Sequence, residues 1–451
     1  MISLIATALL SNQAWATEVT LAVHDAPGPP SETCDQALSR KPRPTRTTSG
    51  NKPPPPPNMD GWTLRKLVDL SPTGQAPPVP IEGDESVLTA IASMFSRADS
   101  GETIRISVLG ASHTEADFFT GEIRRQLQDR YGDAGHGFVM PAVPWKSYRA
   151  QDTNLCYTPH WTGAWAGKNA KTPFMGVGGV TASASDPNAF GWVETTKNNP
   201  MGRTVSSWTL FLEGRTDGGV LLAEIDGTSH IRQSTQRATQ ELITLRINVP
   251  KGPHRITLRP GGDGPTTLLG LSAESGLPGV IVDSMGVRGS SIRTWKNMAE
   301  ATFAQGLKTL GPDLVILAYG TNEVRDPHYS TAAYRSDLDH ALGLLKDTLP
   351  GAACLLIGPS DRSLPVTPDT VATFDRTAVF AAAQKAAAKR HGCASWDWQK
   401  ATGGPGAQAT WNTHEPSWVA PDWVHFTPEG YREVAGLFLS ALEEVAPSIG
   451  Q

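Results

Sequence analysis

The 451-residue chain has only four cysteines, no long apolar run and no cluster of basic residues. After its first residues, no stretch approaches the roughly 18 apolar residues that a membrane-spanning helix needs. Its formal net charge is -5, so a nucleic-acid surface, which requires a concentrated positive face, is not expected. Neither His-Glu-x-x-His nor a paired Cys-x-x-Cys occurs. We therefore expect no metal site and no cofactor.

The cysteines form an even set, which suits an oxidising compartment. Cys354 and Cys393 each open a predicted strand, and neighbouring parallel strands could bring them within bridging distance. Cys34 and Cys156 would then pair by elimination. Four buried free thiols are the alternative, because four cysteines allow three connectivities and the sequence does not choose among them.

The N-terminus reads as a secretory signal. Its apolar segment closes on Ala14-Trp15-Ala16, a small-x-small pattern typical of a cleavage site. We predict a signal peptide over residues 1–16 and a periplasmic or secreted product. The usual positive residues at the start are missing, so an ordinary buried helix is the alternative. Residues 17–85 are predicted to be a Pro-rich segment and linker, which either spaces the protein from an anchor or is a tail without a role.

From residue 86 onward, apolar runs of strand length alternate with helical patterns. The strand-like runs are Ile104 to Val108, Val280 to Val282, Leu314 to Ala318, Cys354 to Ile357 and Ala394 to Trp396. The helical patterns lie near residues 118–127, 295–307, 332–345 and 378–388 and after Thr427-Pro428. Strands separated by helices predict an α/β fold in which a five-stranded parallel sheet lies between two helix layers, a three-layer α/β/α sandwich.

Residues 155–277 interrupt this alternation with short strand-like runs divided by Gly, Asp, Asn and Pro turns. These runs lie at 208–212, 220–225, 244–249 and 256–258. The pattern predicts an all-β sandwich inserted into an α/β domain that comprises residues 86–154 and 278–451. The tryptophans of the insert could stack on sugars, although aromatic residues of β-sandwiches are more often core. They are Trp161, Trp165, Trp192 and Trp208.

Reactive or polar residues follow several predicted strands and precede the last helix. They are Ser112, Gly289, Asn322 and the pair Asp422 and His425. Each residue alone is weak evidence for a catalytic site, because a Ser before a helix is more often a cap and a Gly or Asn after a strand more often forms a turn. Open parallel sheets gather such loops at the carboxyl ends of their strands. Together they favour a nucleophile, Ser112, facing an imidazole that Asp422 orients.

This ordered set resembles the four blocks of the SGNH (GDSL-like) hydrolase superfamily, over roughly residues 86–150 and 278–447. The resemblance implies a flavodoxin-like sheet and a catalytic triad of Ser112, Asp422 and His425. It also implies an oxyanion hole built by Ser112, Gly289 and Asn322.

Two details of the match matter. Gly289 is preferred to Gly286, because the family pattern ends in Gly followed by a small polar residue, here Ser290. The family usually reads Gly-Asp-Ser, and Ala111 stands where that Asp would be. That Asp is neither nucleophile nor proton carrier, so we expect its loss to alter loop support rather than abolish attack.

Within the superfamily, three short motifs are similar to those of bacterial peptidoglycan O-acetylesterases and related wall acetyltransferases. The motifs are Ser112-His113, Phe118-Phe119-Thr120-Gly121 and Tyr131 to Phe138. Members of that group carry a carbohydrate-binding-module-like β-domain after the first block. The resemblance implies a serine esterase that removes O-acetyl groups from an acetylated polysaccharide or cell-wall glycan, first of all peptidoglycan. His113 would line the substrate pocket or be a solvated loop residue. Acetyl transfer by the same triad, or a wall-binding protein that has lost activity, are the alternatives. The sequence does not set the oligomeric state.

Overall fold

The structure is a computed structural model that describes residues 16–21, 61–66, 78–142, 148–167 and 174–450. A five-stranded sheet lies at its centre in the order β15-β3-β16-β17-β20, with every neighbouring pair parallel. Its strands are β3 (Thr103–Gly110), β15 (Gly279–Gly286), β16 (Leu314–Ala318), β17 (Ala353–Ile357) and β20 (Ala394–Trp396). In chain order this is 2-1-3-4-5, the flavodoxin-like arrangement, which places the topological switch point between β3 and β16. The predicted fold class is confirmed.

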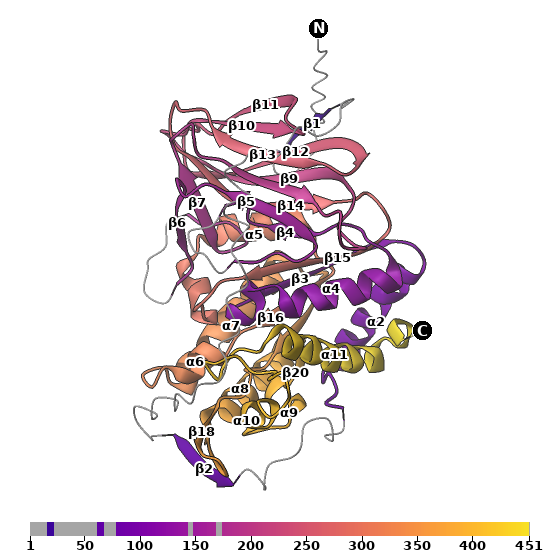
Figure 1. The fold of residues 1–451 in the computed structure, drawn as a ribbon, viewed down its shortest axis with the longest axis vertical. Coiled ribbons are helices and arrows are strands. Elements are labelled where there is room, and N and C mark those ends of the chain that lie inside the picture. Colours follow the sequence, from indigo (N-terminus) through magenta and orange to yellow (C-terminus); the bar gives the residue numbers. More distant parts are fainter. Residues whose placement is uncertain (1–15, 22–60, 67–77, 143–147, 168–173, 451) are drawn as a thin grey trace.

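Helices cover both faces of this sheet (Figure 1). One layer holds α2 (Glu85–Asp99), α4 (Phe118–Tyr131) and α11 (Pro428–Val445), and the other holds α5 (Glu300–Leu310), α7 (Thr331–Thr348) and α8 (Arg376–Arg390). Successive strand residues point to opposite faces. Ile106 and Val108 of β3 therefore pack under α2, α4 and α11, whereas Leu109 belongs to the core under α5, α7 and α8. In the part of the chain that the structure describes, no helix combines the length and the apolar character that crossing a bilayer requires.

Short helices occupy the loops around the sheet. They are α3 (Ser112–Glu115), η2 (Ile292–Asn297), α6 (Thr321–Arg325), α9 (Trp398–Ala401), α10 (Ala407–Trp411) and η3 (Pro447–Gly450). Two of them, α3 and α6, begin directly beyond the carboxyl ends of β3 and β16. The loops at the switch point are therefore short and helical.

The interruption of the α/β alternation folds as two packed β-sheets. One sheet runs β1-β12-β9-β14-β7-β6 with β4 also paired to β14, and the other runs β11-β10-β13-β8-β5. The strands are β4 (Gly137–Val139), β5 (Thr153–Tyr157), β6 (Thr162–Trp165), β7 (Val180–Ala184), β8 (Gly191–Thr195), β9 (Val205–Gly214), β10 (Val220–Ile225), β11 (Ser229–Ser234), β12 (Glu241–Gly252), β13 (Arg255–Pro260) and β14 (Thr266–Glu274). A shared core that includes Leu210 and Leu221 lies between the sheets. The expected β-sandwich is confirmed.

The tryptophans of the sandwich divide by exposure. Trp161, Trp192 and Trp208 are buried, whereas the Trp165 side chain on β6 is 37% exposed. Three of the four therefore serve the interior, as aromatic residues of such folds usually do.

The chain enters and leaves the sandwich at one place. Strand β4 pairs antiparallel with β14, and the Val280 N–H donates to the Gly132 carbonyl at 3.0 Å. A Cβ on Gly279 would lie 2.0 Å from that carbonyl oxygen, so only glycine fits at this crossing. Both connections to the parallel sheet are thus tied together by backbone contacts.

Two strands lie in the N-terminal part of the chain: β1 begins at the last residue of the predicted signal peptide, and β2 lies within the predicted linker. Strand β1 (Ala16–Thr20) lies parallel to β12, and β2 (Trp62–Lys66) joins β18 (Ser363–Thr367) and β19 (Thr370–Phe374) in a small sheet. Each is held by a partner far away in the sequence, which local periodicity does not reveal. The proline-rich stretch and the residues before Ala16 lie outside the described residues.

Cys354 of β17 and Cys393, directly before β20, meet as the sequence suggested they could. Cys354 and Cys393 are disulfide-bonded with their Cα atoms 4.8 Å apart. Cys156 is also disulfide-bonded, and Cys34, its predicted partner, lies outside the described part of the chain. The disulfide therefore joins β17 to the residue that precedes the edge strand β20.

Candidate active site

Ser112 sits on a tight turn from strand to helix. Strand β3 ends at Gly110, and Ser112 is the first residue of α3. A Cβ on Gly110 would lie 2.2 Å from the Thr114 Oγ1, so glycine is what allows the turn to fold back this closely. The Thr114 and Glu115 N–H groups donate to the Ala111 carbonyl. The N–H groups at the start of such a helix lack intrahelical acceptors and favour nearby negative charge.

His425 reaches Ser112 from the loop before the last helix. The Ser112 hydroxyl and the His425 Nε2 are 2.7 Å apart, across 313 positions of the sequence. On the other side of the ring, the Nδ1–H donates to the Asp422 Oδ2 at 2.6 Å. The carboxylate therefore fixes the tautomer whose Nε2 can accept the hydroxyl proton. The structure brings together the three residues that the sequence predicted as a triad.

The loop that holds Asp422 and His425 is locally ordered. The second carboxylate oxygen, Oδ1, accepts the Val424 N–H at 3.1 Å and the His425 N–H at 3.0 Å. Desolvation of Asp422 opposes its ionisation, but these hydrogen bonds and the one from the imidazole outweigh it and lower the pKa of Asp422 well below its ordinary value. Thr427 then caps α11, its hydroxyl accepting the Gly430 N–H, with Pro428 at the first helical position. Asp422 is thus a permanent anion against the imidazole.

The loops after β15 and β16 contact each other beside Ser112. Gly289 has a φ of 71° in an exposed turn, and the Ser290 hydroxyl beside it donates to the Gly110 carbonyl at 3.3 Å. The Asn322 amide donates one N–H to the Ser290 carbonyl at 2.8 Å, which leaves its second N–H for another acceptor. Gly286 instead packs on α3, where a Cβ would lie 2.1 Å from the Glu115 nitrogen. The predicted donors therefore lie on three loops linked through Ser290.

A buried carboxylate that the sequence did not single out holds this arrangement. The side chain of Glu323, directly after Asn322, accepts the Ile292 N–H at 2.7 Å and the Gly320 N–H at 3.0 Å. It thereby joins the loop after β15 to the loop after β16. Burial raises the pKa of Glu323 to about 7. The sequence did hold a signal for this role of Glu323. It stands three residues after Gly320, and that spacing lets a carboxylate accept the backbone N–H at the start of a helix.

Glu323 should make stability fall as pH rises. Its pKa in the folded protein is about 7 against an ordinary value of 4.5, so its stabilising contribution is complete below pH 4.5 and is lost as pH rises through 7. The advantage of the wild type over Glu323→Gln in urea unfolding should shrink by about 3 kcal/mol between pH 4 and pH 8. A difference that stays constant over this range would contradict the assignment.

His113 does not line the surface where substrate would bind. It is 5% exposed, and its Nδ1 and Nε2 lie 2.8 Å from the Tyr431 hydroxyl and 2.9 Å from the Ser360 hydroxyl. Its ring centre is 5.1 Å from that of His425. Burial and the neighbouring His425 hold the pKa of His113 well below its usual range. The prediction of a substrate contact, and the alternative of a solvated residue, both fail because the ring is packed and hydrogen-bonded beneath the imidazole of His425.

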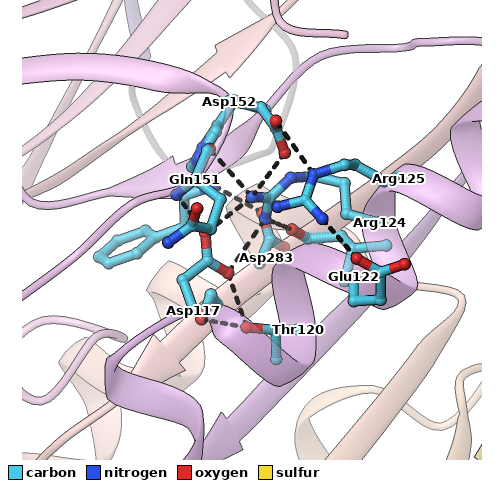
Figure 2. Close-up of polar contacts among 12 residues, drawn as sticks. Asp117, Thr120, Glu122, Arg124, Arg125, Gln151, Asp152 and Asp283 are labelled. Carbon is cyan, nitrogen blue, oxygen red and sulfur yellow. Dashed lines mark hydrogen bonds and ion pairs between the residues drawn. The ribbon is translucent and has the colours of Figure 1, made fainter. Parts of the chain in front are cut away.

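A buried ion pair anchors the segment that follows Ser112 (Figure 2). Asp117, in the left-handed conformation with a φ of 53°, lies 2.7 Å from the Arg124 Nη2, and both side chains are almost fully buried. Burial opposes ionisation of Asp117, yet the charge of Arg124 keeps its pKa below the ordinary value. Arg124 also donates to the Val282 carbonyl of β15 and the Gln151 carbonyl. The pair therefore ties the Ser112 segment to the neighbouring strand and to the chain that enters the sandwich.

Comparisons with known proteins show which families this chain is similar to. Residues 260–433 match the GDSL-like Lipase/Acylhydrolase family. That part contains Gly289, Asn322, Asp422 and His425, while Ser112 lies before the sandwich that divides the catalytic sheet. Residues 260–433 are therefore similar to the GDSL-like acylhydrolases, and the resemblance to SGNH hydrolases is confirmed.

Among solved structures, a peptidoglycan O-acetylesterase is 26% identical, with a TM-score of 0.68 over 82% of this chain and 100% of that chain. An α/β hydrolase from the metagenome of Lake Arreo is 24% identical, with a TM-score of 0.29 over 36% of this chain and 72% of that chain. A family two carbohydrate esterase from Cellvibrio japonicus is 14% identical, with a TM-score of 0.27 over 66% and 98% of the two chains. Only the first is similar enough to support an argument. No curated protein sequence matches the chain.

Proposed function

We propose that this acylhydrolase is an extracytoplasmic serine esterase that removes O-acetyl groups from a polysaccharide, with peptidoglycan as the first candidate. The observation that carries the proposal is the continuous hydrogen-bonded chain from the Asp422 carboxylate through His425 to the Ser112 hydroxyl. The likeness to a peptidoglycan O-acetylesterase over most of this chain supports the substrate class. The disulfide between Cys354 and Cys393 supports an oxidising compartment.

The chemistry follows from the geometry. His425 Nε2 takes the proton as the Ser112 oxygen attacks the acetyl carbonyl, and Asp422 stabilises the imidazolium that forms. The resulting oxyanion would receive the Ser112 and Gly289 N–H groups and the free N–H of Asn322. The imidazolium then protonates the departing sugar oxygen, which leaves an acetyl-enzyme. A water that His425 deprotonates releases acetate and restores the serine.

The test is acetate release from defined glycans. Purified protein should release acetate from O-acetylated peptidoglycan, with acetylated xylan compared at equal acetyl content. Release from xylan alone would overturn peptidoglycan as the substrate. Acetyl label that appears on an added glycan acceptor instead of as free acetate would identify a transferase.

Asn322→Ala should lower kcat by about 10²- to 10³-fold, the usual result of losing one side-chain donor to an oxyanion. The rate of 4-nitrophenyl acetate hydrolysis measures the loss. Asn188→Ala, on an exposed turn of the sandwich, is the matched control and should keep the wild-type rate. If kcat of Asn322→Ala equals that of the wild type, Asn322 is not an oxyanion donor.

A further inference from the structure

A partly buried arginine lies on a loop of the candidate site that the proposed chemistry does not use. Arg362 ends the loop between β17 and β18, at the carboxyl edge of the parallel sheet. Two residues earlier, the Ser360 hydroxyl contacts both His113, which packs against His425, and Thr321, which precedes Asn322. The loop therefore contacts His113, which packs against the triad imidazole, and the helix that carries Asn322.

Within the described residues, the Arg362 guanidinium has no hydrogen-bond or ion-pair partner, and its Nε is buried without an acceptor. The carboxylates near it are already occupied. Asp361 accepts from the Gln399 side chain and from the Gly406 and Gln408 N–H groups. Within the described part of the chain, Asp422 accepts from the Val424 and His425 N–H groups and from the His425 ring. A buried donor left without an acceptor costs stability, so one that persists at the edge of a site suggests an acceptor that arrives from outside.

The charges around Arg362 bear on which acceptor it could bind. Burial and the positive charge of Arg325 lower the pKa of Arg362 to about 10, which still leaves it protonated at neutral pH. Arg325 is the exposed last residue of α6, three positions after Asn322, and among the described residues it too has no acidic partner. The two cations are matched in number by the two nearby carboxylates, Asp361 and Asp422, so the surroundings of Arg362 carry no large net charge. A carboxylate, which brings one negative charge, is accepted more readily in such surroundings than a dianionic phosphate.

We propose that Arg362, assisted by Arg325, binds a carboxylate of the acetylated substrate beside the triad. The planar guanidinium presents paired N–H donors that match the two oxygens of a carboxylate. The inference rests on the proposed function, because it assumes a glycan in the site. It assigns to that glycan an acidic group near the acetyl ester, carried either by the sugar itself or by a peptide attached to it.

Direct binding tests the subsite without relying on turnover. N-acetylmuramic acid carries an ether-linked carboxylate that N-acetylglucosamine lacks, so the pair isolates the acidic group. Isothermal titration calorimetry should give a Kd for N-acetylmuramic acid about tenfold or more below that for N-acetylglucosamine. The dipeptide D-Ala-D-Ala is the second arm, and its binding in place of the sugar acid would locate the carboxylate on a peptide. If neither carboxylate binds more tightly than the neutral sugar, the proposal is wrong.

Two variants decide whether Arg362 is responsible. Arg362→Gln should remove the tenfold preference, and Arg362→Lys, which keeps the charge but not the fork of donors, should retain part of it. Arg390→Gln, which changes an exposed arginine paired with Asp339 on α8 and α7, should keep all of it. A preference that survives in Arg362→Gln with an unchanged unfolding midpoint would overturn the assignment. Failure to release acetate from any glycan would overturn the proposed function while leaving these binding ratios readable.

Discussion

Ser112→Ala is expected to lower kcat/KM for 4-nitrophenyl acetate by at least about 10³-fold. The substitution removes the oxygen that lies 2.7 Å from the His425 Nε2, and with it the atom that would form the acetyl-enzyme. The initial rate of nitrophenolate release, corrected for spontaneous hydrolysis, measures the effect. The variant should unfold at the wild-type urea concentration, because a single hydroxyl at the surface of the turn is lost.

Ser96→Ala is the matched control for that experiment. Ser96 lies on α2, and its hydroxyl donates to the carbonyl one turn earlier on the same helix. Its loss should leave the rate unchanged. An active Ser112→Ala enzyme would show that hydrolysis takes place elsewhere on the protein, and the triad assignment would have to be abandoned.

The second large effect is on stability. Arg124→Met should lower the free energy of unfolding by about 3 to 5 kcal/mol, because it leaves the Asp117 carboxylate buried with its charge uncompensated. Both partners of this ion pair are almost fully buried, so solvent cannot replace the missing guanidinium. Urea unfolding at constant pH measures the change.

An exposed arginine that also pairs with an aspartate provides the comparison. Arg390→Met breaks the contact with Asp339, in which both side chains are more than 40% exposed, and should cost less than about 1 kcal/mol. Equal losses in the two variants would mean that burial does not set the strength of the Arg124 pair. Partial recovery in the double variant Asp117→Asn, Arg124→Met would attribute the loss to the stranded carboxylate.

Much of the site follows from the sequence, because the topology of a parallel sheet determines where its loops meet. Once the strands before Ser112 and Asn322 are recognised, their carboxyl ends must lie at one edge. Asp422 and His425 are three residues apart, so their mutual contact is local and could be expected from spacing alone. The loop order of the superfamily supplied the remaining step, which is the contact between His425 and Ser112.

The parts that sequence reasoning missed depend on contacts with no local signature. His113 looked like a site residue because it follows Ser112, yet its ring turns inward to Tyr431 on α11. Strands β1 and β2 are stabilised by β12 and β19, which lie hundreds of residues away. The buried partners of Arg124 likewise come from several elements, and a charged residue in an amphipathic helix is more often solvated.

The backbone pairing where the sandwich joins the catalytic sheet affects how far mutations in the sandwich can reach the catalytic sheet. Adjacent strands β3 and β15 are separated by the whole sandwich in the chain, but backbone pairing between Gly132 and Val280 closes that excursion at its base. The entropy lost in closing the loop between β3 and β15 depends only weakly on the number of residues in that loop. The register between the two strands is therefore held at the base of the sandwich and does not depend on the length of the chain between them. Mutation could remodel the face of the sandwich that points away from the catalytic sheet while that register is kept.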